Sequence, residues 1–150
     1  MKVKDCMTRH VVAARRQATC RELAQKMLAS RFNGIPIVDD HLRVIGMVTE
    51  FDLLKALQSD RSHVFGAVIA EEIMSQEPIC IEEDSDLDEA IQLMTQHHII
   101  RLPVVRKNRL VGVISRSDIL RAFVQDSFLL VQDGQIVPED KNHHDGKALP

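Results

Sequence analysis

The sequence predicts a mixed α/β fold in which one β-α-β-β-α unit occurs twice. Three observations predict it: similar segments recur at a nearly constant interval, each copy contains helices with one apolar face, and each copy contains two apolar runs joined by a polar turn. Pro103 follows Pro36 at this interval, and Gly112 follows Gly46 at an interval one residue shorter. The predicted parts are a first unit (residues 3–57), a linker (58–68), a second unit (69–124) and a C-terminal tail (125–150).

Each unit opens with a short apolar run that predicts a strand, over residues 11–13 in the first copy and 79–81 in the second. An amphipathic helix follows in each copy. Its start is marked by a polar residue that is followed three positions later by glutamate, the spacing of a capping box. The two capping pairs are Thr19 with Glu22 and Asp86 with Glu89.

Two apolar, β-branched runs then predict a hairpin in each unit, with polar turns at residues 39–41 and 106–108. A second helix begins at Thr49 in the first unit and at Ser115 in the second. A unit of this size buries little apolar surface alone. We therefore expect the two copies to pack against each other with pseudo-two-fold symmetry into one module.

The composition excludes several classes of protein. A net charge of -3 and the absence of Trp and Tyr argue against a nucleic-acid binder, which needs clustered cations and stacking aromatic groups. No apolar run has the length of a membrane span, and no apolar stretch follows the first charged residues as in a secretory signal. The three cysteines are far apart in the sequence, as is usual for reduced thiols. We expect a cytoplasmic protein.

The tail predicts a small hairpin around Asp133-Gly134, within residues 128–138, and a disordered stretch over 139–150. His143-His144 in that stretch is a weak metal-site signal. Without Cys or a carboxylate cluster at ligand spacing, a solvated tail is the better interpretation, and we predict no metal site. His97 and His98 follow an apolar helix face, and we expect them at a helix end or on the surface.

A motif of the form G-x-x-[ST]-x-x-D stands where a predicted strand meets a helix in both units. A helix start exposes N–H groups that suit a phosphate, and a hydroxyl there can donate to a phosphate oxygen. Glycine lets a ligand approach the backbone closely. A carboxylate one turn later can accept two hydrogen bonds from the hydroxyls of a ribose. The motif residues are Gly46, Thr49 and Asp52, and then Gly112, Ser115 and Asp118.

The same spacing has a structural alternative. Ser or Thr followed three residues later by an acid also caps a helix, so Thr49 with Asp52 and Ser115 with Asp118 could do no more than that. Duplication of the motif does not decide between the two roles, because a copied unit copies its caps.

In these segments the chain resembles the CBS domain, named for cystathionine β-synthase, over about residues 3–124. The shared pieces are Met7-Thr8 and Met74-Ser75, the capped first helices, the Ile-Pro-Ile-Val and Leu-Pro-Val-Val strands, and the closing Gly-to-Asp motifs. The resemblance implies a tandem module with two clefts that bind adenosyl ligands such as AMP, ADP, ATP or S-adenosylmethionine. It implies that Thr or Ser meets phosphate, that Asp meets ribose, and that the module forms a homodimer.

The resemblance also places the adenine among apolar residues, although from the sequence alone a place in the core is the better interpretation for any one of them. They are Val12, Ile35 and Pro36 in one cleft and Ile79, Leu102 and Pro103 in the other. The clefts are expected to differ. Arg116 follows the hydroxyl in the second motif where the first has Glu50, and Arg101 stands where the first unit has Gly34. An arginine can bind phosphate, so the cleft that uses Asp118 should bind anionic nucleotide more tightly.

Three functions remain open at this point. The first is a sensor module, in which nucleotide binding shifts a dimer arrangement that an unidentified partner protein reads. The second is an interaction module whose clefts bind nothing. An enzyme is the third and weakest, because the sequence shows no nucleophile with a base at recognisable spacing, no metal-ligand set and no P-loop. We predict no catalytic residue and no catalytic cofactor.

Overall fold

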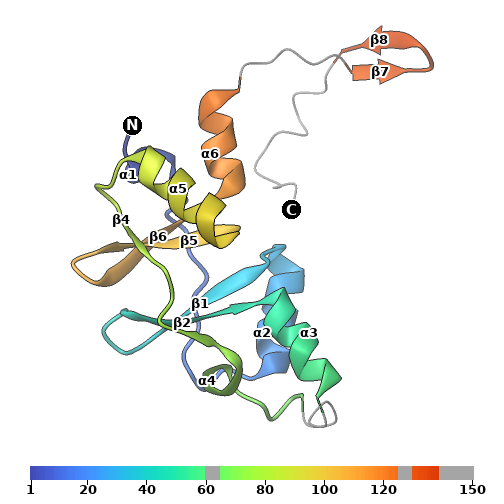
Figure 1. The fold of residues 1–150 in the computed structure, drawn as a ribbon. Helices are drawn as coiled ribbons and strands as arrows, with labels where there is room; N and C mark the ends of the chain where they lie inside the picture. Colours follow the sequence, from blue (N-terminus) through green and yellow to red (C-terminus); the bar gives the residue numbers. More distant parts are fainter. Residues whose placement is uncertain (60–64, 125–129, 139–150) are drawn as a thin grey trace.

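The computed structural model describes residues 1–59, 65–124 and 130–138. It has two α/β halves, each with a small sheet covered by two helices, and a separate hairpin (Figure 1). The first half consists of α2 (Cys20–Ser30), β1 (Gly34–Val38), β2 (Val44–Thr49) and α3 (Glu50–Gln58). The second half consists of β4 (Ile81–Glu82), α5 (Leu87–His97), β5 (Arg101–Arg106), β6 (Arg109–Ser115) and α6 (Arg116–Phe123). The predicted double α/β unit is confirmed.

Three of the helix starts follow the predicted capping pattern, and one does not. At α2 the Thr19 side chain accepts from the Glu22 N–H, and the Glu22 carboxylate accepts from the Thr19 backbone. At α5 the expected box is absent, because the Asp86 side chain accepts no cap hydrogen bond. Its carboxylate instead lies 3.1 Å from the Lys2 ammonium. Asp86 is thus the N-cap residue of α5 as predicted, but its side-chain capping box with Glu89 is absent.

Antiparallel hairpins form the centre of both halves. In the first, Pro36 lies opposite Met47, and in the second, Pro103 lies opposite Val113. Of the two predicted opening strands, the first does not form and the second begins later than predicted. Ala14 makes only an isolated parallel bridge to β1, so no strand forms over residues 11–13, and β4 begins at the last residue of the predicted run over 79–81.

Each half is completed by a segment of the other repeat. The opening segment of the first repeat, with α1 (Val3–Cys6), lies on the second half, where Thr8 exchanges two backbone hydrogen bonds of 2.8 and 2.9 Å with Val113. The matching segment of the second repeat, with α4 (Ala70–Ile73) and β3 (Ser75–Gln76), pairs with β2 of the first half. Figure 1 shows α1 beside α5 and α4 beside β2. We call these two segments the crossing segments.

The crossing segments contribute side chains to both hydrophobic cores. Val3 and Met7 are buried in the core of the second half, and Val68 and Ala70 are buried in the core of the first. The repeats seen in the sequence are therefore not the units that pack. The first core also contains Cys20, Leu23, Met27, Ile35, Ile37, Val48 and Leu53, and the second contains Ile81, Leu87, Ala90, Met94, Leu102, Val104, Ile114 and Ile119.

The motif glycines lie under the crossing segments. A Cβ at Gly46 would stand 2.9 Å from the Ser75 carbonyl oxygen and would clash with the Met74 sulfur. A Cβ at Gly112 would stand 2.9 Å from the Thr8 carbonyl oxygen and 2.7 Å from the Met7 sulfur. Both glycines thus have a packing role that the sequence analysis did not anticipate, and their contact with a ligand stays a prediction.

The predicted tail hairpin is present as β7 (Leu130–Gln132) and β8 (Gln135–Val137). Asp133 and Gly134 form its turn with φ values of 51° and 75°, the left-handed backbone that a two-residue hairpin requires. Residues 128–129, the stretch over 139–150 with His143-His144, and residues 60–64 of the linker lie outside the described residues. Within the described ranges, no helix combines the length and apolar character needed to cross a bilayer.

Candidate ligand-binding cleft

The hydroxyl and carboxylate residues of both motifs form helix caps. Thr49 Oγ1 accepts from the Asp52 N–H at 3.3 Å, and Asp52 Oδ2 accepts from the Thr49 N–H at 2.8 Å. The same pair of bonds joins Ser115 and Asp118 at 3.1 and 2.9 Å. The helix-capping role that the sequence left open for these residues is thus present in both units. It does not exclude ligand binding, because each carboxylate has a second oxygen that is not used by the cap.

The second carboxylate oxygens have different neighbours. Asp118 Oδ1 lies 3.0 Å from the guanidinium of Arg121, and the Thr8 hydroxyl donates to the Asp118 carboxylate at 3.4 Å. Asp52 Oδ1 lies 4.0 Å from the Lys55 ammonium. Thr8 belongs to a crossing segment, so the motif of the second repeat is placed beside residues of the first.

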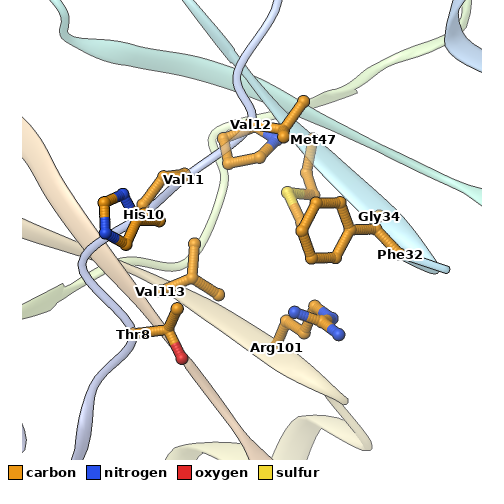
Figure 2. Close-up of a pocket in the computed structure, with 10 residues that line it drawn as sticks. Thr8, His10, Val11, Val12, Phe32, Gly34, Met47, Arg101 and Val113 are labelled. Atoms are coloured by element: carbon orange, nitrogen blue, oxygen red, sulfur yellow. The ribbon is translucent and has the colours of Figure 1, made fainter. Parts of the chain in front are cut away.

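A cleft opens where Thr8 meets the two halves (Figure 2). About 20 Å³ of it is free for a water-sized molecule, and about 330 Å³ lies between the protein atoms when the part open to solvent is counted. Figure 2 shows Arg101 and Phe32 on one side of the cleft and His10 and Thr8 on the other. The walls are mostly apolar and come from both repeats. The lining residues are Thr8, His10, Val11, Val12, Phe32, Gly34, Pro36, Met47, Arg101 and Val113.

Arg101 is the cation of this cleft. Its Nε donates to the side-chain oxygen of Asn33 at 2.9 Å, and its guanidinium lies 5.1 Å from the centroid of the Phe32 ring. Burial lowers the pKa of the Arg101 guanidinium, and the negative charge of Asp118 opposes that shift. Arginine nevertheless stays protonated in proteins, so the cleft holds a permanent positive charge.

Three of the residues predicted to touch a ligand line the cleft, namely Val12, Pro36 and Arg101. Ile35 and Leu102 do not line it. Both are fully buried in the two cores, because alternate residues of a strand point to opposite faces. Their predicted adenine contact therefore has no support in this cleft.

The remaining predicted residues lie elsewhere. Ile79 is part of the packing around the second core, and Pro103 lies in β5 opposite Val113. Arg116 is outside the lining of this cleft, and its Nε donates to the carbonyl oxygen of Ile99 at 2.9 Å. A second hollow, lined by Asp52, Lys55, Ala56, Ser59, Val68 and Ile73, contains none of the predicted adenine contacts.

The cleft also contains residues that sequence reasoning missed. Thr8, His10 and Phe32 belong to the first repeat, yet they complete a site at the motif of the second. The sequence did show that Met7-Thr8 matches Met74-Ser75, but it did not show that these segments cross to the opposite half. The described residues contain no group of three or more His, Cys, Asp or Glu side chains arranged to hold a metal ion. His97 and His98 end α5, as expected.

The fold and the cleft together define a class: a tandem module whose two homologous halves exchange segments and have a cleft at their junction. Comparison with known families identifies the repeat. The family model described as the CBS domain matches residues 3–59 and again residues 70–125. The chain belongs to the CBS domain family, and its two repeats form a CBS domain pair.

Solved CBS domain pairs resemble this structure closely. The CBS domain pair of protein MJ0100, in complex with 5′-methylthioadenosine and S-adenosyl-L-methionine, has a TM-score of 0.73 and 31% identity, with coverage of 82% of this chain and 95% of that one. CBSX2 in complex with AMP has a TM-score of 0.71 and 25% identity, with coverage of 81% and 94%.

The module also occurs inside longer proteins. L-aspartate semialdehyde sulfurtransferase of Methanocaldococcus jannaschii is 31% identical over 122 residues, which is 81% of this chain. The match spans only 23% of the sulfurtransferase, about a quarter of its length. The likeness therefore concerns the CBS domain pair and not the whole enzyme.

Proposed function

We propose that this chain is a regulatory module without catalytic activity. It binds an adenosine nucleotide (AMP, ADP or ATP) or S-adenosylmethionine between its two CBS motifs. Ligand binding is then signalled to a partner protein. The observation that carries the proposal is the cleft at the junction of the halves, where apolar walls lie next to Arg101 and to the Thr8–Asp118 contact. The adenosyl ligands of the MJ0100 and CBSX2 structures support it.

The chemistry of the cleft suits the parts of a nucleotide. Val12, Pro36 and Met47 offer apolar surface for an adenine ring. The Asp118 carboxylate can accept hydrogen bonds from ribose hydroxyls, after exchanging its contact with the exposed Arg121 side chain. Ser115 stands at the start of α6, where backbone N–H groups favour a phosphate.

A ligand in this cleft can change the arrangement of the two halves. Its walls come from both repeats, and Asp118 belongs to the half opposite Val12 and Pro36. A nucleotide that contacts both sides stabilises the arrangement in which it fits best. The population of that arrangement then rises with ligand concentration, which a bound partner protein can read.

Binding should be visible as thermal stabilisation. At ten times its dissociation constant, a ligand adds about 1.4 kcal/mol to the free energy of unfolding. For a chain of this size the melting temperature should rise by roughly 3–6 °C. We would measure melting curves with AMP, ADP, ATP and S-adenosylmethionine. If millimolar concentrations of all four leave the melting temperature unchanged, the sensor proposal is wrong, and an interaction module with empty clefts becomes the better assignment.

The proposal includes a homodimer. The helices α3 and α6 expose apolar side chains that do not pack in the intramolecular core. An exposed apolar patch of this kind usually marks a contact surface. In α3 the exposed fraction is 66% for Phe51 and 59% for Leu54. The other exposed apolar side chains of this surface are those of Leu57 in α3, Leu120 and Phe123 in α6, and Val124 directly after α6.

Charge on this surface should dissociate the dimer. We expect sedimentation at micromolar concentration to give the dimer mass for the unmodified protein and the monomer mass for Leu54→Glu, because a carboxylate is costly to bury in an apolar contact. Leu28→Glu is the matched control, since Leu28 is a leucine of α2 with 81% of its surface exposed. A monomeric unmodified protein, or equal dissociation by both variants, would contradict the assignment of this surface.

A further inference from the structure

One wall of the cleft is formed by the crossing segment of the first repeat. Between Thr8 and Ala14 this segment passes from the second half to the first. Within the described part of the chain, the backbone of residues 9–13 makes no hydrogen bond to another backbone group. The connection therefore runs along the cleft without belonging to either sheet, and we call residues 1–13 the strap. The strap residues that line the cleft are Thr8, His10, Val11 and Val12 (Figure 2).

The other end of the strap is docked on the loop before α5. The Val3 side chain is fully buried there, and the Val3 N–H donates to the carbonyl oxygen of Ser85 at 2.9 Å. Next to it, the Lys4 ammonium lies 2.7 Å from the Asp84 carboxylate in an exposed ion pair. Exposed ion pairs contribute little to stability. A short segment held by so few contacts can open locally while the rest of the fold stays intact.

Opening of the strap would take the cleft apart. The Thr8 hydroxyl donates to the Asp118 carboxylate at 3.4 Å, and Thr8 exchanges two backbone hydrogen bonds with Val113. When the strap lifts, these contacts break, and Val11 and Val12 leave the cleft wall. A ligand in the cleft therefore stabilises only the closed strap, so it makes opening rarer by the factor that its concentration and dissociation constant set.

The crossing segment of the second repeat provides an internal reference. It is docked in the same way, because Ala70 is fully buried and its N–H donates to the carbonyl oxygen of Ala18 at 2.7 Å. Of the described residues that line the cleft, however, none belongs to the range 69–79. The two crossing segments thus share a mode of docking, and only the strap touches the cleft.

We propose that the strap is a closing device operated by the ligand. A nucleotide in the cleft holds residues 1–13 on the second half, and without it the strap opens more often and exposes Val3 together with the core surface beneath. The inference rests on the proposed function and deepens it, because it names the part of the molecule in which ligand binding becomes visible to a partner protein. That part includes α1, which lies outside the cleft lining.

Hydrogen exchange of the full chain, followed by mass spectrometry, tests the proposal. The ligand would be whichever of AMP, ADP, ATP and S-adenosylmethionine binds most tightly in calorimetry. At ten times its dissociation constant, we expect the amides of residues 3–8 to exchange about tenfold more slowly than without ligand. The amides of residues 70–74, in the reference segment, should change less than about twofold because their opening breaks no ligand contact.

A charge reversal gives a second measurement. In Lys4→Glu a repulsive pair replaces the attractive pair with Asp84, so the strap amides should exchange about threefold faster than in the unmodified protein. Lys26→Glu is the matched control, because it makes the same reversal at an exposed position of α2 away from the strap. It should leave the exchange of the strap amides unchanged.

The outcomes separate this inference from the proposed function. If a ligand binds in calorimetry and the strap amides exchange equally fast with and without it, the ligand does not operate the strap, although nucleotide binding itself stands. Equal slowing of both crossing segments, or equal exchange rates in Lys4→Glu and Lys26→Glu, would also overturn the inference. If calorimetry detects binding of none of the four ligands, both the inference and the proposed function are wrong.

Discussion

Gly112→Ala should lower the free energy of unfolding by about 2–3 kcal/mol, and Gly46→Ala by a similar amount. The added Cβ would meet a backbone carbonyl oxygen at 2.9 Å at both positions, besides a methionine side chain. A methionine can move away, but the carbonyl belongs to the crossing segment, which would have to lift from its strand. Overpacking of this kind typically costs about 1–3 kcal/mol. Chemical denaturation followed by circular dichroism would measure the loss.

Gly66→Ala is the matched control for these variants. A Cβ there would meet only the flexible end of the Arg21 side chain, at 3.1–3.4 Å, which can swing aside. We expect its unfolding free energy to stay within about 0.5 kcal/mol of the unmodified protein, as for other surface substitutions. If Gly112→Ala is as stable as Gly66→Ala, the crossing segments are held less tightly than the structure indicates.

Asp118→Ala should weaken nucleotide binding by about ten- to a hundredfold, more than Asp52→Ala does. A hydrogen bond to a charged group contributes about 1.5–3 kcal/mol, and each factor of ten in affinity corresponds to about 1.4 kcal/mol. Asp118 is joined through Thr8 to the cleft that also contains Arg101, whereas Asp52 has no such link to it. Calorimetric titration of both variants with AMP would test the difference.

A second variant separates binding from stability. Asp118 is also the third residue of α6, so alanine removes its half of the capping box, the hydrogen bond from the Ser115 N–H, while Ser115 still caps the helix. Asp118→Asn keeps an oxygen that can accept the cap hydrogen bond but loses the charge, and we expect it to weaken AMP binding with little change in unfolding. If Asp52→Ala abolishes the tighter binding event and Asp118→Ala leaves it intact, the asymmetry between the motifs is the reverse of our prediction.

Local patterns predicted much of the fold. The hairpins, the helix starts at Thr49 and Ser115 and the turn at Asp133-Gly134 depend on residues close in sequence, so the sequence contains the information directly. Features that depend on distant partners were missed. The Asp86 carboxylate pairs with Lys2, and next to the run over 11–13 only Ala14 pairs with β1.

The candidate site was predictable to a similar extent. The repeat and the resemblance pointed to the motif residues, which do not line the cleft, and to Val12, Pro36 and Arg101, which do. Periodicity alone could not distinguish Pro36, which lines the cleft, from Ile35, which lies next to it in the core. The sequence also suggested Arg116 as a phosphate ligand; its Nε donates to the carbonyl oxygen of Ile99, and its contact with a phosphate stays a prediction. Such choices depend on contacts between residues far apart in the chain.

The crossing segments have a consequence for synthesis on the ribosome, where a chain emerges from its N-terminus. The first half can complete its core once residue 76 has emerged, because Val68, Ala70 and β3 are then available. Val3 and Met7 are made before the first half, yet their places in the second core exist only after β5 and β6 have formed. These two apolar residues must therefore stay exposed until the second half has been made. A nascent chain stalled between the two repeats should present this N-terminal segment to chaperones and proteases.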